Sequence, residues 1–463
     1  MVSLYPDQSD MIERTVESLR KGHKSVLMQY PTGGGKSVMA TEIVRRAVAK
    51  GNNVWFTVPR RELIRQMGQT FQDFGLPYGL IAAGHRYRPD RAAYVCSTDT
   101  LKSRLASFTP PALAVIDETH FGGDGLDKII KWMKAGGTTI LGLSATPWKL
   151  SGQGLGCWYD DMVIGPSVRE LIDAGRLSDY RGFAPSHIDM RGIGISGGDY
   201  AKKQLSDMME EDKVLIGNAV KHYKDHALGK LNVVYCVSIA HSKMVAESYN
   251  VAGIPAAHID GTTPDDERRR IIRAYANREL LVLCNCELLT FGFDLASQVG
   301  MEVTIECMSD LRPTKSLALQ MQKWGRVLRR KDNPAIIFDH ANNFLEHGLP
   351  CDERQWTLAD REKGKGGTKG EAIIPVKECD RCHFCHKPAP QCPNCGNIYE
   401  VQSRTIKEVD GELAEVDLEN IKRKARQEVG RARSIEDLQA IAKQRGYKPG
   451  WIKIQAKLRG LSH

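Results

Sequence analysis

Residues 31–37, Pro-Thr-Gly-Gly-Gly-Lys-Ser, combine a flexible backbone with side chains that suit a nucleoside triphosphate. Consecutive glycines let backbone N–H groups turn toward phosphate oxygens without Cβ clashes. The Lys36 amine can reach the β- and γ-phosphates, and the Ser37 hydroxyl can bind Mg²⁺. An ordinary glycine turn is the alternative, but this loop follows the apolar run 26–28 and opens a helical pattern. The residues predicted to bind the nucleotide here are Thr32, Gly33, Gly34, Gly35, Lys36 and Ser37.

Two adjacent carboxylates, Asp117 and Glu118, follow the apolar run 113–116. In a parallel sheet this places both at the carboxyl end of a strand, beside the phosphate loop. Asp117 is predicted to hold Mg²⁺ through water, and Glu118 to orient and deprotonate the attacking water. Upstream, the amide of Gln8 can pair with both the ring nitrogen and the exocyclic amine of adenine, which would select ATP. The alternatives are an acidic turn and a surface glutamine.

Two arginines, Arg326 and Arg329, are three residues apart and share one face of a predicted helix. Guanidinium groups stay charged and bind phosphate oxygens through two hydrogen bonds. Both can therefore point at a γ-phosphate held by an earlier part of the chain, whereas a basic helix without a catalytic role is the alternative. The catalytic residues predicted from their chemistry are Lys36, Asp117, Glu118, Arg326 and Arg329.

Five of the twelve cysteines lie between positions 379 and 395, in the order Cys-x2-Cys-x2-Cys-x6-Cys-x2-Cys. Clustering of this kind indicates a metal site, because paired Cys-x2-Cys segments supply four thiolates for a tetrahedral Zn²⁺ ion. Cys385 is an alternative ligand, His383 and His386 are further substitutes, and a redox-active cysteine pair is the alternative function. The preferred zinc ligands are Cys379, Cys382, Cys392 and Cys395.

These groups need a scaffold that brings distant segments together, and the chain predicts one because buried strand-like runs alternate with helical patterns. A chain of 463 residues is too long for one core. The first series predicts a doubly wound α/β domain over residues 1–169, with parallel strands at 26–28, 54–58, 94–97, 113–116 and 139–143. The second predicts a similar domain over residues 170–350, with strands at 233–237, 256–259, 281–284, 303–307 and 335–338.

The C-terminal region differs in composition. A glycine- and lysine-rich run at 363–370 predicts a flexible linker over residues 351–376, followed by a zinc ribbon at 377–398 and a basic helical tail at 399–463. Residues 421–459 contain twelve lysines or arginines and three acidic residues, an excess equal to the +9 charge of the whole chain. A basic tail on a neutral body indicates binding to nucleic-acid phosphates, and a solvated helix face is the alternative.

Targeting signals are not evident. No run of eighteen apolar residues occurs, and residues 1–10 lack a basic region followed by an apolar one. We therefore expect neither a membrane span nor a secretory signal, and we predict a cytoplasmic protein of a bacterial or phage-infected cell.

The motifs occur in an order that resembles the superfamily 2 helicases of the DEAH-like type. The match rests on the short phosphate loop, Asp-Glu-Thr-His at 117–120, Ser-Ala-Thr-Pro at 144–147, Thr-Phe-Gly-Phe-Asp at 290–294 and Gln-x-x-Gly-Arg-x-x-Arg at 322–329. Two further segments, 311–316 and 339–343, narrow the resemblance to the RadD and phage-encoded DNA helicase group. Departures from the usual pattern are Tyr5 in place of an arginine and Thr119 in place of an alanine or cysteine.

This resemblance implies two RecA-like domains with ATP and Mg²⁺ in the cleft between them, and it implies that Gly292 and Asp294 lie on the nucleotide side of that cleft. It also adds Gln322 to the catalytic residues. The residues implied to contact the nucleic-acid backbone are Arg60, Thr98, Thr262 and Thr290. The predicted function is that of an ATP-dependent DNA helicase or translocase in replication, recombination or repair. We expect single-stranded or branched DNA as its substrate and a replication or repair protein as a partner of the C-terminal region. The alternatives are an RNA helicase, a restriction-system motor subunit, and an ATP-switched nucleic-acid-binding scaffold without unwinding.

Overall fold

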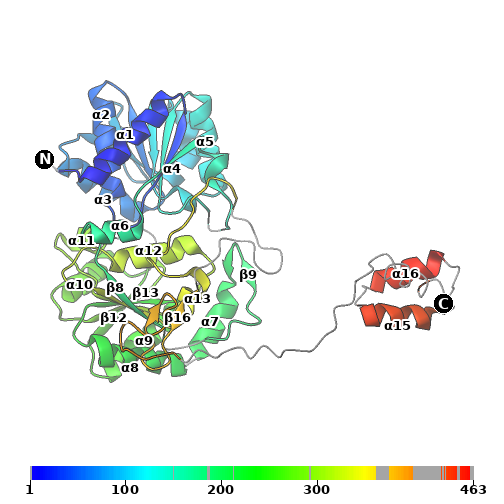
Figure 1. Ribbon diagram of the computed structural model, residues 1–463. Coiled ribbons are helices and arrows are strands. Elements are labelled where there is room, and N and C mark those ends of the chain that lie inside the picture. The colour runs from blue at the N-terminus through cyan, green and yellow to red at the C-terminus, as the bar shows by residue number, and fades with distance from the viewer. Residues whose placement is uncertain are drawn as a thin grey trace. The chain divides into compact units, whose positions relative to one another are not determined.

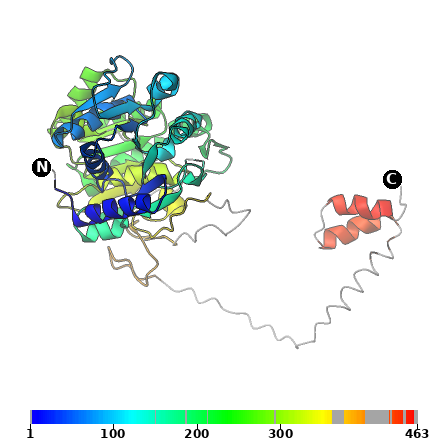
Figure 2. The same cartoon turned by 90° about the horizontal axis from the view of Figure 1, so that it is seen from above.

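The computed structural model describes residues 3–149, 151–184, 188–211, 213–290, 294–360, 375–399, 429, 432, 434–445 and 449–458. The chain divides into two compact units, Met1–Tyr399 and Glu400–His463. The first unit contains two large parallel β-sheets with helices packed on them, seen from two directions in Figures 1 and 2. We call the elements from α1 to α6 lobe 1 and those from β8 to α13 lobe 2. The two sheets confirm the predicted fold class. In the part of the chain described, no helix is both long and apolar enough to cross a membrane.

Lobe 1 is built on a parallel sheet with the strand order β3-β4-β2-β5-β6-β1-β7. Its strands are β1 (Ser25–Gln29), β2 (Val54–Val58), β3 (Tyr78–Ile81), β4 (Ala93–Ser97), β5 (Leu113–Ile116), β6 (Thr139–Ser144) and β7 (Asp161–Ile164). Helices α1 (Pro6–Arg20), α2 (Lys36–Ala49) and α3 (Arg61–Asp73) pack on one face, and α4 (Thr98–Arg104) and α5 (Asp124–Ala135) on the other. Successive residues of a strand point to opposite faces of the sheet. On β2, Phe56 packs on the face covered by α1, α2 and α3, and Trp55 packs on the face covered by α4 and α5. The short helices are η1 (Leu105–Ser107), η2 (Thr119–Phe121), η3 (Leu155–Cys157) and α6 (Val168–Asp173).

Lobe 2 is built on a second parallel sheet, in the order β12-β13-β11-β14-β15-β8. Its strands are β8 (Tyr180–Phe183), β11 (Asn232–Cys236), β12 (Ala256–Ile259), β13 (Val282–Cys286), β14 (Cys307–Asp310) and β15 (Ala335–Asp339). One face carries α7 (Lys202–Glu211), α8 (Lys213–Ala227) and α9 (Ile239–Val251). The other carries α10 (Asp265–Ala276), α11 (Leu295–Val299), α12 (Leu317–Val327) and α13 (Asn343–His347). A small hairpin, β9 (Ile195–Ser196) and β10 (Asp199–Tyr200), and the short helix η4 (Leu288–Thr290) complete the lobe.

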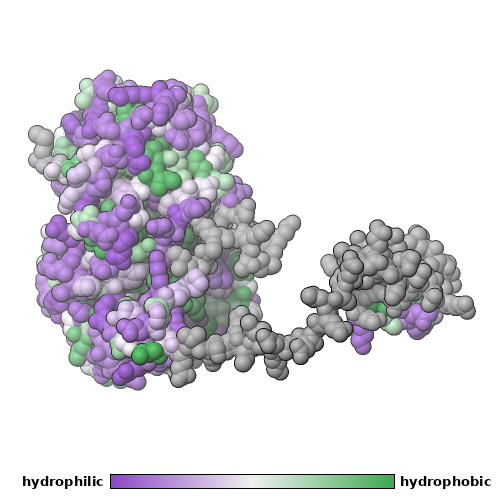
Figure 3. All heavy atoms as spheres, in the orientation of Figure 1, coloured by the Kyte–Doolittle hydropathy of each residue, from purple (hydrophilic) through white to green (hydrophobic). Residues whose placement is uncertain are grey.

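Apolar side chains are concentrated in four buried clusters, one on each face of the two sheets. On the face of the first unit shown in Figure 3, the surface is mainly hydrophilic, with small hydrophobic patches between hydrophilic ones. Burial of apolar surface on both faces is typical of parallel sheets and explains why the strands are nearly continuous apolar runs.

One strand prediction is wrong in position. The expected strand at 303–307 was based on apolar residues, but β14 begins at Cys307 and ends at Asp310. All four of its residues are buried, including Ser309 and Asp310, because these two polar side chains find hydrogen-bond partners inside lobe 2. An apolar pattern does not reveal a strand whose second half is polar and buried.

The predicted linker also begins too early. Residues 351–360 are packed against lobe 1: the Trp148 indole donates to the carbonyl of Ala359 at 3.0 Å, and Gly156 N–H donates to that of Leu358 at 2.9 Å. The glycine- and lysine-rich residues 361–374 lie outside the described part of the chain.

The cysteine-rich segment follows as a small module at 375–399. Its two short strands, β16 (Lys377–Glu378) and β17 (Cys385–His386), pair antiparallel. The module packs on the edge strand of lobe 2, where Ala184 N–H donates to the carbonyl of His383 at 3.1 Å. It therefore covers the outer side of β8.

The second unit contains two helices among its described residues, α15 (Ile435–Arg445) and α16 (Pro449–Leu458). Helix α15 begins with a reciprocal cap: Asp437 N–H donates to the Ser434 hydroxyl at 3.1 Å, and Ser434 N–H donates to the Asp437 carboxylate at 3.1 Å. Most of the remaining predicted tail lies outside the described residues.

Candidate active site

The phosphate loop, residues 30–35, joins β1 to the start of α2. Gly33 and Gly35 have φ angles of +86° and +99°, which L side chains rarely adopt. Lys36 is 8% exposed, and its amine donates to the carbonyl of Tyr30 across the loop at 3.3 Å. The loop therefore has the concave backbone and the inward lysine that a phosphate group requires.

Helix α1 is attached to this loop by Gln8. The Gln8 amide donates to the carbonyl of Gly34 at 3.0 Å and accepts from Tyr5 N–H at 3.1 Å. Arg176, which follows α6, donates to the same carbonyl at 3.1 Å and lies 3.4 Å above the Tyr5 ring. Sequence reasoning did not identify Arg176, which is distant in the chain. The adenine contact proposed for Gln8 stays a prediction, but its amide is adjacent to the loop, as that contact requires.

The acidic pair lies at the end of β5, as predicted. Glu118 has a φ of 43°, and its N–H donates to the Asp117 carboxylate at 3.0 Å. Burial and the neighbouring Glu118 raise the pKa of Asp117 to about 7, although the Lys36 charge opposes this. One oxygen of Glu118 is buried and accepts no hydrogen bond from any described residue. A partly buried carboxylate pair of this kind fits Mg²⁺, because a bound cation stabilises the ionised form of both.

His120, to which sequence reasoning assigned no role, connects three motifs. Its Nδ1 is 2.8 Å from the Ser144 hydroxyl, and its Nε2 is 3.3 Å from the amide nitrogen of Gln322. Burial lowers the pKa of His120 to about 4, so the ring is neutral near pH 7. The Ser144 hydroxyl donates to the carbonyl of Thr146, so it accepts from Nδ1–H of His120. Nε2 then accepts from the Gln322 amide. This bridge joins lobe 1 to α12 of lobe 2.

The two lobes also approach each other closely at Gly325. A Cβ on Gly325 would lie 2.3 Å from the Cβ of Thr32, and one on Gly33 would lie 2.8 Å from the carbonyl of Gly325. The next residue, Arg326, is 6% exposed, and burial lowers its pKa. The predicted arginine therefore follows the residue that abuts the phosphate loop, and the charge of Glu118 acts on it.

Arg329 lies just after α12 and pairs with Asp294 at 2.5 Å. Its carbonyl accepts a hydrogen bond from the Ser178 hydroxyl at 3.2 Å. The pairing brings two predicted nucleotide-side residues together, whereas Gly292 lies outside the described residues.

The predicted nucleic-acid contacts fall at the carboxyl ends of neighbouring strands. Arg60 follows β2 and Thr98 follows β4, which pair in lobe 1, and the Thr98 hydroxyl donates to the carbonyl of Val58 at 3.0 Å. Thr262 follows β12 in lobe 2, and its hydroxyl donates to Asp260 at 2.7 Å. Thr290 ends η4 after the adjacent β13, and its side chain is outside the described residues. Their role in binding stays a prediction.

The four cysteines preferred as zinc ligands lie close together in the structure. The ligand atoms of Cys379, Cys382, Cys392 and Cys395 all lie within 4.8 Å of one another. Two of the Sγ–Sγ distances are 3.6 and 3.7 Å. A tetrahedron with Zn–S bonds of about 2.3 Å has edges of about 3.8 Å, so the four thiols fit zinc. Cys385 is not in this cluster, because its thiol points to the carbonyl of His383 and its side chain joins the core of lobe 2.

Comparison with known proteins places this geometry in a family. The family described as "Type III restriction enzyme, res subunit" matches residues 1–149. A 51.5 kDa protein of Lactococcus phage (isolate 7-9) is 33% identical over 402 residues, which cover 86% of this chain and 84% of the relative. The putative ATP-dependent helicase IRC3 of Saccharomyces cerevisiae is 27% identical, over 71% of this chain and 50% of the relative. The chain belongs to the superfamily 2 helicases. It is a nucleic-acid-dependent ATPase.

Solved structures share the fold of this superfamily 2 helicase. A fragment of a putative HsdR subunit of a type I restriction enzyme from Vibrio vulnificus has a TM-score of 0.56 and 18% identity, over 73% of this chain and 64% of that one. The restriction-modification enzyme LlaBIII bound to DNA has a TM-score of 0.54 and 12% identity, over 73% of this chain and 28% of that one. The chain therefore spans half of IRC3 and less than two thirds of either solved structure.

Proposed function

We propose that this protein is a DNA helicase or translocase in which ATP is hydrolysed between lobe 1 and lobe 2. The observation that carries the proposal is the bridge from His120 to Ser144 and Gln322, which joins three motifs across the two lobes. A junction of this kind can transmit a change at the nucleotide to the relative position of the lobes. We take lobe 1 and lobe 2 as the two moving domains, which the sequence predicts as residues 1–169 and 170–350.

In this proposal each charged group has a separate role. The phosphate loop and Lys36 bind the triphosphate, and Asp117 and Ser37 hold Mg²⁺, which would neutralise charge on the phosphates. Glu118 orients the attacking water and accepts its proton. Arg326 stabilises the negative charge that develops on the transferred phosphoryl group. Arg329 would have to leave Asp294 before it reaches the nucleotide.

DNA is favoured over RNA by the comparisons, whereas the basic segment near the C-terminus would bind the phosphates of either nucleic acid. The matching family and a further relative, 26% identical, are named for restriction enzymes. The basic residues of 421–459 supply phosphate-binding charge that the rest of the chain lacks. We propose single-stranded or branched DNA in replication, recombination or repair as the substrate, in the cytoplasm of a bacterial or phage-infected cell.

The four-cysteine cluster is proposed to bind Zn²⁺. Burial opposes ionisation of Cys379, but hydrogen bonds from the backbone N–H groups of Cys382 and Arg381 outweigh it and lower its pKa to about 6. The metal would stabilise a module whose regular secondary structure is one pair of two-residue strands, β16 and β17.

The test is a set of ATPase rates with single-stranded, duplex and forked DNA and with RNA, together with a strand-displacement assay. We expect DNA to raise kcat more than RNA does, and forked DNA to be unwound. The Glu118→Gln variant is the matched control, because it should bind ATP and DNA without turnover. Equal stimulation of the ATPase by RNA would refute the DNA assignment. ATPase activity without strand displacement would indicate a translocase that does not unwind DNA.

The similarity to restriction enzymes supports one second candidate, the motor subunit of a restriction system. That candidate predicts DNA cleavage when the protein is combined with a nuclease subunit. A DNA helicase predicts strand displacement by the chain alone.

A further inference from the structure

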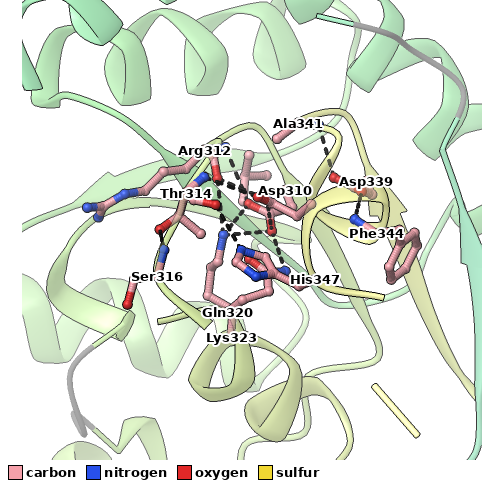
Figure 4. A network of polar contacts seen from close by, with 12 residues as sticks. Asp310, Arg312, Thr314, Ser316, Gln320, Lys323, Asp339, Ala341, Phe344 and His347 are labelled. Carbon is pink, nitrogen blue, oxygen red and sulfur yellow. Dashed lines mark hydrogen bonds and ion pairs between the residues drawn. The ribbon is translucent and has the colours of Figure 1, made fainter. Parts of the chain in front are cut away.

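A buried polar cluster lies behind α12 in lobe 2 (Figure 4). Its centre is Asp310, the last residue of β14. The Lys323 amine donates to both Asp310 oxygens, at 2.8 and 2.7 Å. The amides of Gln320 and Asn343 each donate to the same carboxylate at 3.0 Å. None of these four side chains is more than 1% exposed. We call Asp310, Gln320, Lys323 and Asn343 the α12 frame.

The frame joins two segments that the proposed site does not use. The carbonyl of Arg312, in segment 311–316, accepts from Lys323 at 3.2 Å and from Asn343 at 3.0 Å. Thr314 N–H donates to the Asn343 amide oxygen at 3.1 Å. Asn343, from segment 339–343, is therefore bonded to Asp310, to segment 311–316 and, through Asp310, to α12.

Helix α12 thus has two sides with different contacts. Gln320 and Lys323 are three residues apart and bond to Asp310, whereas Gln322 and Gly325, also three apart, share the opposite face. Gln322 contacts His120 of lobe 1, and Gly325 abuts Thr32 of the phosphate loop. A small rotation or shift of α12 at the frame would therefore move its residues at the lobe junction.

The chemistry of the frame suits positioning better than stabilisation. A buried ion pair loses its hydration and is often no more stabilising than apolar residues of similar volume. Its hydrogen bonds are directional, however, and the Lys323 amine has three acceptors: both Asp310 oxygens and the Arg312 carbonyl. An apolar side chain could fill the same space without fixing where α12 lies along its axis.

We propose that Lys323 and Gln320 are positioning residues for ATP hydrolysis, which hold α12 so that Arg326 and Gln322 stay in register with the phosphate loop. The proposal deepens the function given above and rests on the role assigned there to Arg326. The segments 311–316 and 339–343 then share one function, that of the support for this helix.

The test compares variants of the full chain by kcat at saturating DNA, and by the dissociation constant of a fluorescent ATP analogue. Gln320→Met removes one frame bond with little change in volume. It should also fold, because the Gln320 amide oxygen has no hydrogen-bond partner among the described residues. We expect kcat to fall about 10-fold with ATP binding changed less than about 2-fold, since a shift below 1 Å is enough for a loss of this order. Lys323→Met should lose more, and Lys323→Arg, which keeps the charge and a donor, should recover part of the loss.

Two reference variants separate the possible causes. Val233→Ala makes a cavity in the same core, on β11, and should lower the melting temperature without the same loss of kcat. Arg326→Ala removes the arginine itself. If Arg326→Ala hydrolyses ATP normally, the proposed function is wrong. If Arg326→Ala is inactive but Gln320→Met keeps its kcat, the positioning role is overturned. The same holds if Gln320→Met loses no more kcat than Val233→Ala does at equal stability. Gln320→Met decides the outcome even if Lys323→Met does not fold.

Discussion

Substitution of Gly325 by alanine should abolish most ATP hydrolysis without weakening the fold. An added Cβ would lie 2.3 Å from the Cβ of Thr32, which is 1.1 Å inside the 3.4 Å at which ordinary van der Waals contact begins. Because the neighbouring phosphate-loop carbonyl is also only 2.9 Å away, the loop and α12 must separate by about 1 Å. A misplacement of about 1 Å can lower a rate about 100-fold, and we expect that loss in kcat. Alanine is about 1 kcal/mol better than glycine in a helix, so α12 itself should not be destabilised.

The matched control for this prediction is Gly217→Ala in α8. It is the same substitution in a helix of lobe 2, but a Cβ there would have no heavy atom within 4 Å. It should leave kcat unchanged and raise the free energy of unfolding by up to about 1 kcal/mol. Steady-state ATPase rates and thermal melts of both variants decide the matter. A Gly325→Ala protein with near-normal kcat would show that the lobes do not approach in this way during hydrolysis.

Three further predictions concern the separate parts of the protein. Lys36→Ala should weaken ATP binding, because it removes a phosphate ligand. Glu118→Gln should keep ATP bound and lower the rate of hydrolysis about 10²–10⁴-fold. Binding of a fluorescent ATP analogue, measured together with kcat, checks both. Cys392→Ser should release the metal, measured by atomic absorption, and increase hydrogen exchange in β8, since the cysteine module covers that edge. A chain that ends at residue 362 should bind DNA with a salt slope shallower by about 0.7–0.9 for each lost phosphate contact. An unchanged slope would assign the tail to a protein partner.

Much of the candidate site could be predicted because its signals are local. The glycine loop with Lys36 and the acidic pair at 117–118 each need specific residue types at adjacent positions after a buried strand. The structure places both where the sequence predicts them, and it brings together the four preferred cysteines.

The remaining contacts could not be predicted, because they join residues that are distant in the chain. Arg176 reaches the phosphate loop, and His120 reaches Gln322, only because of how the sheets pack. Neither residue type indicates its partner. The search for apolar runs missed the polar end of β14, because Asp310 is buried as an ion pair with Lys323. A single sequence gives no sign of that pairing. Compositional bias at 363–370 predicts a linker but does not show that residues 351–360 pack against lobe 1.

The central claim is that ATP is hydrolysed where the two lobes meet, and the full-length Arg326→Ala variant tests it most directly. Single-turnover hydrolysis in the presence of DNA should be measured together with the dissociation constant of the fluorescent ATP analogue. The account predicts a loss in rate of about 10³-fold or more, with ATP binding nearly unchanged, because the triphosphate is held by lobe 1 and the arginine is supplied by lobe 2. A hydrolysis rate close to that of the unmodified protein would contradict it.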